Sequence, residues 1–146
     1  MRMTTADDAV TAARAYIGTR WRDKGRSRRG LDCVGLLIVV GWETGLLSRE
    51  YDVRDYPRRP VDSRLIRTLA RWARRRPQDA APMTGDLVAF VGSEGLGCHV
   101  GIVSRGASAA AVPGLVHASE ELGRVAEHDL PRGRVLGLYR PGYEEG

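Results

Sequence analysis

Several residue types are scarce in this chain of 146 residues. Two cysteines are too few for the framework of spaced pairs that marks a disulfide-stabilised domain, so we expect both thiols to be free. No Cys-x-x-Cys pair is present, so no metal site is expected. The apolar run Val34–Val40 is far too short to cross a bilayer. Residues Met1–Asp8 lack the apolar core of a signal peptide, so we expect synthesis in the cytoplasm without export by a cleaved signal.

Lysine is also scarce, because only Lys24 among the 23 basic residues is a lysine. A GC-rich genome would explain this arginine bias. The net charge is +5, and no motif with interleaved aromatic residues points to nucleic-acid binding. Residues Val61–Arg76 predict a helix capped by Asp62 or Ser63, with an apolar face and an arginine face. The apolar face holds Leu65, Leu69, Trp72 and Ala73, and the basic face holds Arg64, Arg67, Arg71, Arg74 and Arg75. The basic face is either a solvated surface or a contact for an acidic partner or an anionic cell wall.

The length and the 42% apolar content predict one domain, residues 1–146, with a single core. A first helix is expected over Thr4–Ile17, with Val10, Ala13 and Ile17 on its buried face, and a second helix over Val34–Trp42. A glycine- and arginine-rich loop, residues 18–31, joins them, and residues 107–111 predict a hairpin loop. Strands are expected at Asp86–Val91, His99–Ser104, Leu115–Ala118, Arg124–His128 and Val135–Arg140. Helices followed by strands predict an α+β domain with helices packed on one face of an antiparallel sheet.

Cys33 stands at the start of the second predicted helix, directly after Asp32. Asp32 is a good N-cap, and the helix is expected to end near Gly45. Because a helix N-terminus carries about half a positive charge, we expect the Cys33 thiol to be unusually acidic and its backbone N–H to suit an oxyanion. Cys33 is therefore the candidate nucleophile.

A thiol nucleophile needs a base, and the chain has three histidines. His99 lies on a predicted strand and is the candidate general base. His117, on the next strand, is the candidate residue that orients the base, and His128 is the alternative. Cys98 adjoins His99 and is expected to be a packed thiol.

Four ordered motifs together resemble the NlpC family, the papain-like cysteine peptidases of bacterial cell walls. The first is Asp32-Cys33-Val34-Gly35-Leu36, which is similar to the family's nucleophile motif. The others are Gly85–Phe90, His99–Val103 and Val116–Ala118. The resemblance covers roughly residues 5 to 140 and implies a papain-like NlpC-type fold, a Cys33-His99-His117 triad and no cofactor. The segment Gly25–Gly30 most resembles the phage, prophage and gene-transfer-agent branch.

Two positions depart from the family pattern. Trp21 stands where the family usually has a tyrosine near the oxyanion site, although its indole N–H is still a donor. Val34 replaces the usual serine after the nucleophile, which affects substrate preference. Trp21, Asp32, Arg20, Arg22 and Arg26 are the candidate substrate-binding residues, the arginines because they suit substrate carboxylates.

The resemblance implies a cysteine endopeptidase that cleaves peptidoglycan stem peptides between the D-glutamate γ-carboxyl and the following diamino acid. Because no export signal is apparent, we expect the enzyme to be carried in a phage-like particle, with tail or baseplate partners, and to act in the cell wall or periplasm of a target cell. Release by lysis is another route. Two other functions remain open: a papain-like amidase or acyltransferase acting on another acyl substrate, and a structural tail component with a vestigial site.

Overall fold

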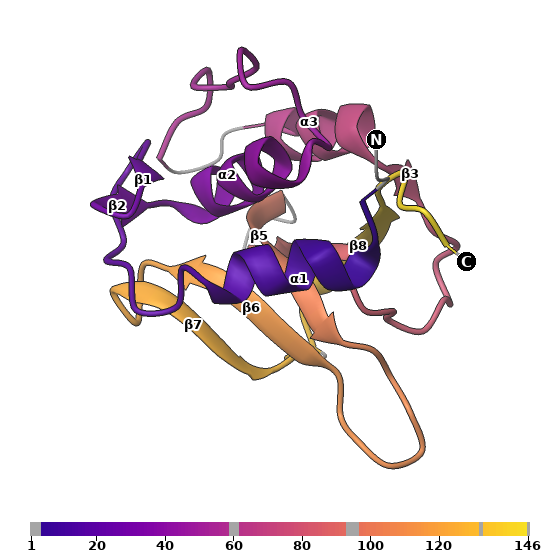
Figure 1. The fold of residues 1–146 in the computed structure, drawn as a ribbon. Coiled ribbons are helices and arrows are strands. Elements are labelled where there is room, and N and C mark those ends of the chain that lie inside the picture. The colour runs from indigo at the N-terminus through magenta and orange to yellow at the C-terminus, as the bar shows by residue number, and fades with distance from the viewer. Residues whose placement is uncertain (1–3, 59–61, 93–96, 132, 146) are drawn as a thin grey trace.

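The computed structural model describes residues 4–58, 62–92, 97–131 and 133–145. Helices α1 (Ala6–Arg14) and α2 (Cys33–Thr44) lie across one face of an antiparallel sheet, with α3 (Arg64–Trp72) beside α2 (Figure 1). Within the described ranges the sheet has six strands, in the order β3-β8-β4-β5-β6-β7. Their bounds are β3 Arg74–Arg75, β4 Leu87–Val91, β5 Gly97–Arg105, β6 Gly114–Ser119, β7 Arg124–Asp129 and β8 Val135–Arg140. The predicted α+β class, with helices on one face of an antiparallel sheet, is confirmed.

The alternation of apolar residues in the strands separates two clusters, one on each face of the sheet. Leu87 and Ala89 of β4 join the main core with the buried residues of α1 and α2, whereas Val88 and Phe90 belong to the second cluster. The α2 helix is buried along most of its length, because it packs against the sheet and against α1 beside it. No helix in the described ranges is both long and apolar enough to span a bilayer.

Two helices end earlier than predicted. The first helix ends at Arg14, not Ile17, and a tight turn follows, so Ile17 is 46% exposed instead of joining Val10 and Ala13 in the core. The third helix ends at Trp72, because Ala73 is extended and Arg74 and Arg75 pair with β8. The predicted start of that helix at Val61 lies outside the described residues.

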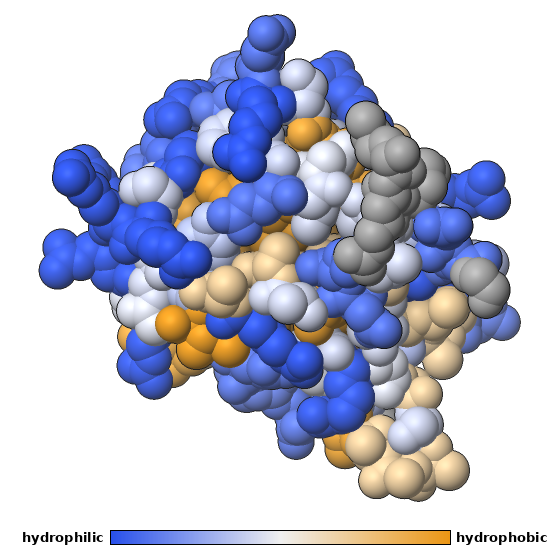
Figure 2. All heavy atoms as spheres, in the orientation of Figure 1, coloured by the Kyte–Doolittle hydropathy of each residue, from blue (hydrophilic) through white to orange (hydrophobic). Residues whose placement is uncertain are grey.

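Short pairings inside the loops were not predicted. Strands β1 (Arg26–Ser27) and β2 (Gly30–Leu31) form a two-stranded hairpin within the loop that precedes Cys33. The loop between β5 and β6 contains the predicted hairpin loop, residues 107–111, and projects from the molecule (Figure 1). The tip of the projection is apolar, whereas much of the visible face is hydrophilic (Figure 2).

Candidate active site

Cys33 is the first residue of α2, and Asp32 is its N-cap. The Asp32 carboxylate accepts a hydrogen bond from the backbone N–H of Gly35 at 2.7 Å, as the sequence predicts. Gly45 closes the other end of the helix in the left-handed conformation. These two caps define the ends of the helix and place Cys33 in its first turn.

Asp32 is also the centre of a buried polar cluster. Its side chain accepts hydrogen bonds from the Lys24 backbone N–H at 2.8 Å, the Tyr56 hydroxyl at 2.6 Å and the Arg26 guanidinium at 3.1 Å. The side chains of Arg26 and Asp32 are only 6% and 5% exposed. Gly35 allows this loop to pack close to α2, because an added Cβ would lie 2.1 Å from the Gly25 carbonyl oxygen. The cluster therefore holds the loop of residues 24–26 against the start of the helix.

The Cys33 thiol is not acidic, which contradicts the sequence prediction. Its pKa is raised to about 12, first by burial and second by the charge of Asp32. Hydrogen bonds from the backbone N–H groups of Val100, Val34 and Cys33 lower the pKa, but by less. The backbone N–H groups at the helix N-terminus therefore lower the pKa of Cys33, as expected. Desolvation and the charge of the adjacent Asp32 carboxylate raise this pKa by more. At neutral pH the resting site holds a thiol.

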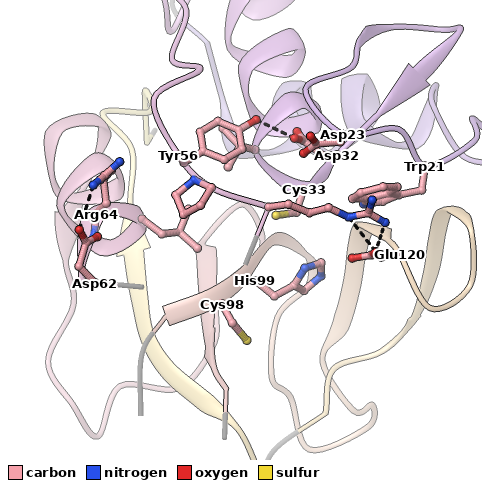
Figure 3. A pocket seen from close by; sticks show the side chains of 14 residues that line it. Trp21, Asp23, Asp32, Cys33, Tyr56, Asp62, Arg64, Cys98, His99 and Glu120 are labelled. Carbon is pink, nitrogen blue, oxygen red and sulfur yellow. Dashed lines mark hydrogen bonds and ion pairs between the residues drawn. The ribbon is translucent and has the colours of Figure 1, made fainter. Parts of the chain in front are cut away.

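The pairing between strands β5 and β6 ends close to the pocket that Cys33 lines. Strands β5 and β6 pair from Ile102 opposite Val116 to Arg105 opposite Gly114, so their ladder ends before His99 is reached. His99 pairs with Phe90 of β4, and the two rings are in contact with centroids 5.7 Å apart. Cys33 and His99 line the same pocket, and in Figure 3 the imidazole lies between Cys33 above and Cys98 below.

The three histidines form a continuous chain. The distance from His99 Nε2 to His117 Nδ1 is 2.6 Å, and that from His117 Nε2 to His128 Nε2 is 2.7 Å. His128 Nδ1 lies 2.8 Å from the backbone carbonyl oxygen of Asp129. The sequence left His117 and His128 as alternative partners of the base, and the structure places His117 next to His99 with His128 behind it.

The histidines nearest the thiol are neutral at neutral pH. Burial and the charge of His128 lower the pKa of His99 to about 4. Burial, with the charges of His99 and His128, lowers the pKa of His117 to about 3. A neutral thiol and a neutral imidazole are the reactants for nucleophilic acyl transfer in which the base accepts the thiol proton during attack.

These shifts predict the pH dependence of both titration and stability. In an NMR titration the imidazole resonances of His99 are expected to move near pH 4, not near the usual 6.5. Between pH 6.5 and about 4 the unfolded chain binds more protons than the folded chain, so the free energy of unfolding should decrease as the pH falls through this window. Titration of His99 near pH 6.5, with no loss of stability, would contradict the burial described here.

The pocket is a slot of about 90 Å³. Trp21, a predicted substrate-binding residue, is among the residues that line the slot, and the Arg58 guanidinium lies 4.8 Å from the centre of the Trp21 ring. Arg58 also pairs with Glu120 (Figure 3). Ligand pockets usually measure about 300–1,000 Å³, so this slot fits a small group, not a whole peptide. The Arg58–Glu120 pair is about half-exposed and contributes little stability.

The predicted substrate-binding arginines do not line this slot. The Arg26 guanidinium is buried and donates to Asp32, Asp52, Tyr56 and the carbonyl oxygens of Gly25 and Val53. Its donors are committed to the protein, which argues against substrate contact. Arg20 and Arg22 are exposed and lie outside the residues that form the slot. Asp32 borders the slot, but its carboxylate is occupied by the cluster described above.

Other residues of the site were not found from the sequence. Tyr56, Arg58 and Glu120 line the slot together with Asp62 and Arg64 from the start of α3. No sequence motif marks them, because Glu120 follows β6 and lies far along the chain from the connection and helix start that supply the other four residues. Cys98 borders the slot, and both Cys33 and Cys98 are free thiols. Within the described ranges, no three histidine, cysteine or acidic side chains are arranged to hold a metal ion.

Comparison with known proteins places the fold. No protein-family model matches the sequence, and no curated protein matches it. Solved NlpC/P60 domains do match the structure at low sequence identity. The P60 domain of an antigen from M. avium subspecies paratuberculosis is 19% identical, with a TM-score of 0.63, 96% of this chain covered and 96% of that chain. The NlpC/p60 domain of the peptidoglycan hydrolase SagA is 22% identical, with a TM-score of 0.61 and coverage of 93% and 98%. A wild-type endolysin is 19% identical, with a TM-score of 0.65 and coverage of 97% and 66%. The chain therefore has the fold of NlpC/P60 peptidoglycan hydrolases.

Proposed function

We propose that this protein is a cell-wall peptidase, a cysteine endopeptidase in which Cys33 is the nucleophile, His99 the general base and His117 the residue that orients it. One observation carries the proposal. Cys33 at the start of a buried helix and His99 on a strand line one pocket, and the far nitrogen of His99 lies 2.6 Å from His117. A peptidoglycan hydrolase and an endolysin among the structures of the same fold support the substrate class.

The reaction begins from the neutral pair. As the Cys33 sulfur attacks the peptide carbonyl, the S–H proton passes to His99 Nδ1, so the buried site never holds an isolated thiolate. The backbone N–H of Cys33 is positioned at the helix start to stabilise the oxyanion. His99 then protonates the leaving amine, and water hydrolyses the thioester and restores the thiol.

The resemblance of the motifs further supports cleavage between the D-glutamate γ-carboxyl and the diamino acid of the stem peptide. The similarity of Gly25–Gly30 to the phage branch supports carriage in a phage-like particle with tail or baseplate partners, and action in the cell wall or periplasm of a target cell.

Digestion of purified peptidoglycan, read by mass spectrometry, tests the proposal. The wild type is expected to release stem-peptide fragments whose new termini name the bond, and Cys33→Ala is expected to release none. Identical traces without fragments from both proteins would exclude the peptidase and favour another acyl substrate or a structural particle protein. Fragments from both proteins would exclude Cys33 as the nucleophile.

A further inference from the structure

The histidine chain ends on a group that has only one hydrogen-bonding role. A backbone carbonyl oxygen is only an acceptor, so the contact at 2.8 Å requires His128 Nδ1 to donate to the Asp129 carbonyl. A neutral imidazole carries one proton on its two nitrogens. In the neutral form of His128, Nε2 is then unprotonated and must accept.

The same rule fixes the proton on each ring in turn. His117 Nε2, 2.7 Å from His128 Nε2, must donate to it, which leaves His117 Nδ1 as an acceptor. His99 Nε2, 2.6 Å from His117 Nδ1, must therefore carry the proton of His99. The lone pair of His99 is left on Nδ1, which is the atom that a base needs to present to a thiol.

We propose that His128, held by the Asp129 carbonyl, is a positioning residue that sets the tautomer of His99 through His117. The inference rests on the proposed function in one respect, since it assigns His99 as the base for Cys33. The sequence predicts His128 only as an alternative to His117, whereas in the structure His117 contacts His99 and His128 contacts His117.

The strand register builds this arrangement. His128 pairs with Leu115 and His117 pairs with Ala126, so both histidines lie on the same face of β6 and β7 as diagonal neighbours. The rings meet edge to face, with centroids 4.9 Å apart for His99 and His117 and 4.7 Å apart for His117 and His128. His128 is exposed, so its replacement leaves no cavity in the core.

The hydrogen bonds between the histidines suit both the neutral and the protonated form of His99. When His99 accepts the thiol proton, its Nε2–H still donates to His117 Nδ1, so no other proton has to move. Protonation of His117 would break the order, because both of its nitrogens would donate and His99 would have to carry its proton on Nδ1. Both acidic residues of β7 are engaged in ion pairs: Asp129 with Arg105, and Glu127 with Arg14.

Two variants of His128 and one control separate positioning from structure. In His128→Gln the amide oxygen still accepts from His117 and the amide N–H still donates to the carbonyl, whereas His128→Leu offers no acceptor. Arg124→Gln, an exposed change on the same strand, is the control. The measurements are kcat and KM on stem peptides, thermal unfolding, and imidazole ¹⁵N shifts, which report the tautomer of each histidine without substrate.

We expect His128→Leu to lower kcat by about 10- to 100-fold, the range for outer positioning groups, with KM within about twofold. The His99 proton should redistribute between Nδ1 and Nε2 in the same variant. His128→Gln and Arg124→Gln should keep kcat within about threefold and retain the Nε2–H tautomer of His99.

Equal losses of kcat in His128→Leu and His128→Gln, or an unchanged His99 tautomer in His128→Leu, would overturn the proposal. If the wild type released no stem peptides but its tautomer responded to His128→Leu, the peptidase function would fall and the positioning role would stand.

Discussion

Replacing Cys33 by alanine is expected to lower peptidoglycan hydrolysis by on the order of 10⁴-fold or more, because the sulfur forms the covalent bond to the substrate. The other thiol among the described side chains that line the slot is Cys98, on the same strand as His99. The Cys33 side chain is small and only partly exposed, so the change removes one sulfur atom with little effect on packing. Initial rates on purified peptidoglycan, with far-UV circular dichroism to verify folding, measure the effect.

Cys98→Ala is the matched control, because both residues are free thiols that border the same slot. We expect this variant to keep its rate within about threefold of the wild type, since no hydrogen bond of the described residues links Cys98 to the histidine chain. A large loss in Cys98→Ala with activity retained in Cys33→Ala would assign the nucleophile to the strand instead of the helix.

Replacing Asp32 by alanine is expected to lower the free energy of unfolding by about 3–5 kcal/mol, the usual result of removing one member of a buried ion pair. The variant loses the N-cap of α2. It also removes the buried carboxylate that pairs with the Arg26 guanidinium, whose side chain is only 6% exposed. Tyr56 loses the acceptor of its hydroxyl at the same time. A decrease in Tm of about 10 °C or more, measured by calorimetry, corresponds to this loss.

Asp52→Asn is the control, because Asp52 also pairs with Arg26 but its side chain is 26% exposed. An exposed pair contributes about 1 kcal/mol or less, so a small effect is expected there. If Asp32→Ala unfolded no more easily than Asp52→Asn, the cluster around Asp32 would not be a major source of stability.

Neutralising Asp32 should also make the thiol more reactive. The Asp32 charge is the second largest cause that raises the pKa of Cys33, so Asp32→Asn should lower this pKa and move the iodoacetamide reaction to lower pH. The rate is best followed in a Cys98→Ala background, where Cys33 is the only cysteine. An unchanged pH profile would show that burial alone sets the pKa.

Much of the fold follows from local patterns in the sequence. The apolar run after Asp32, with Gly45 at its end, determines helix α2, because an N-cap, a helical run and a left-handed glycine act within a few residues of one another. The five long strands were predicted from β-branched runs between glycine and proline turns. Cys33 and His99 were likewise selected by motif, and the structure places both in one pocket.

Tertiary contacts decided the remaining features, because each depends on groups far apart in the chain. The pairing of Arg74 and Arg75 with β8 ended the third helix early, which no local pattern indicated. Desolvation by the surrounding protein reversed the expected acidity of Cys33, although the helix N-terminus was identified correctly. The sequence contains three histidines, but it does not show that they are neighbours. The register of β6 with β7, and the end of the β5–β6 pairing before His99, place them in a hydrogen-bonded series. The sequence by itself thus determined which residues begin the helix and form the strands, whereas long-range packing determined the protonation of the thiol and the order of the histidines.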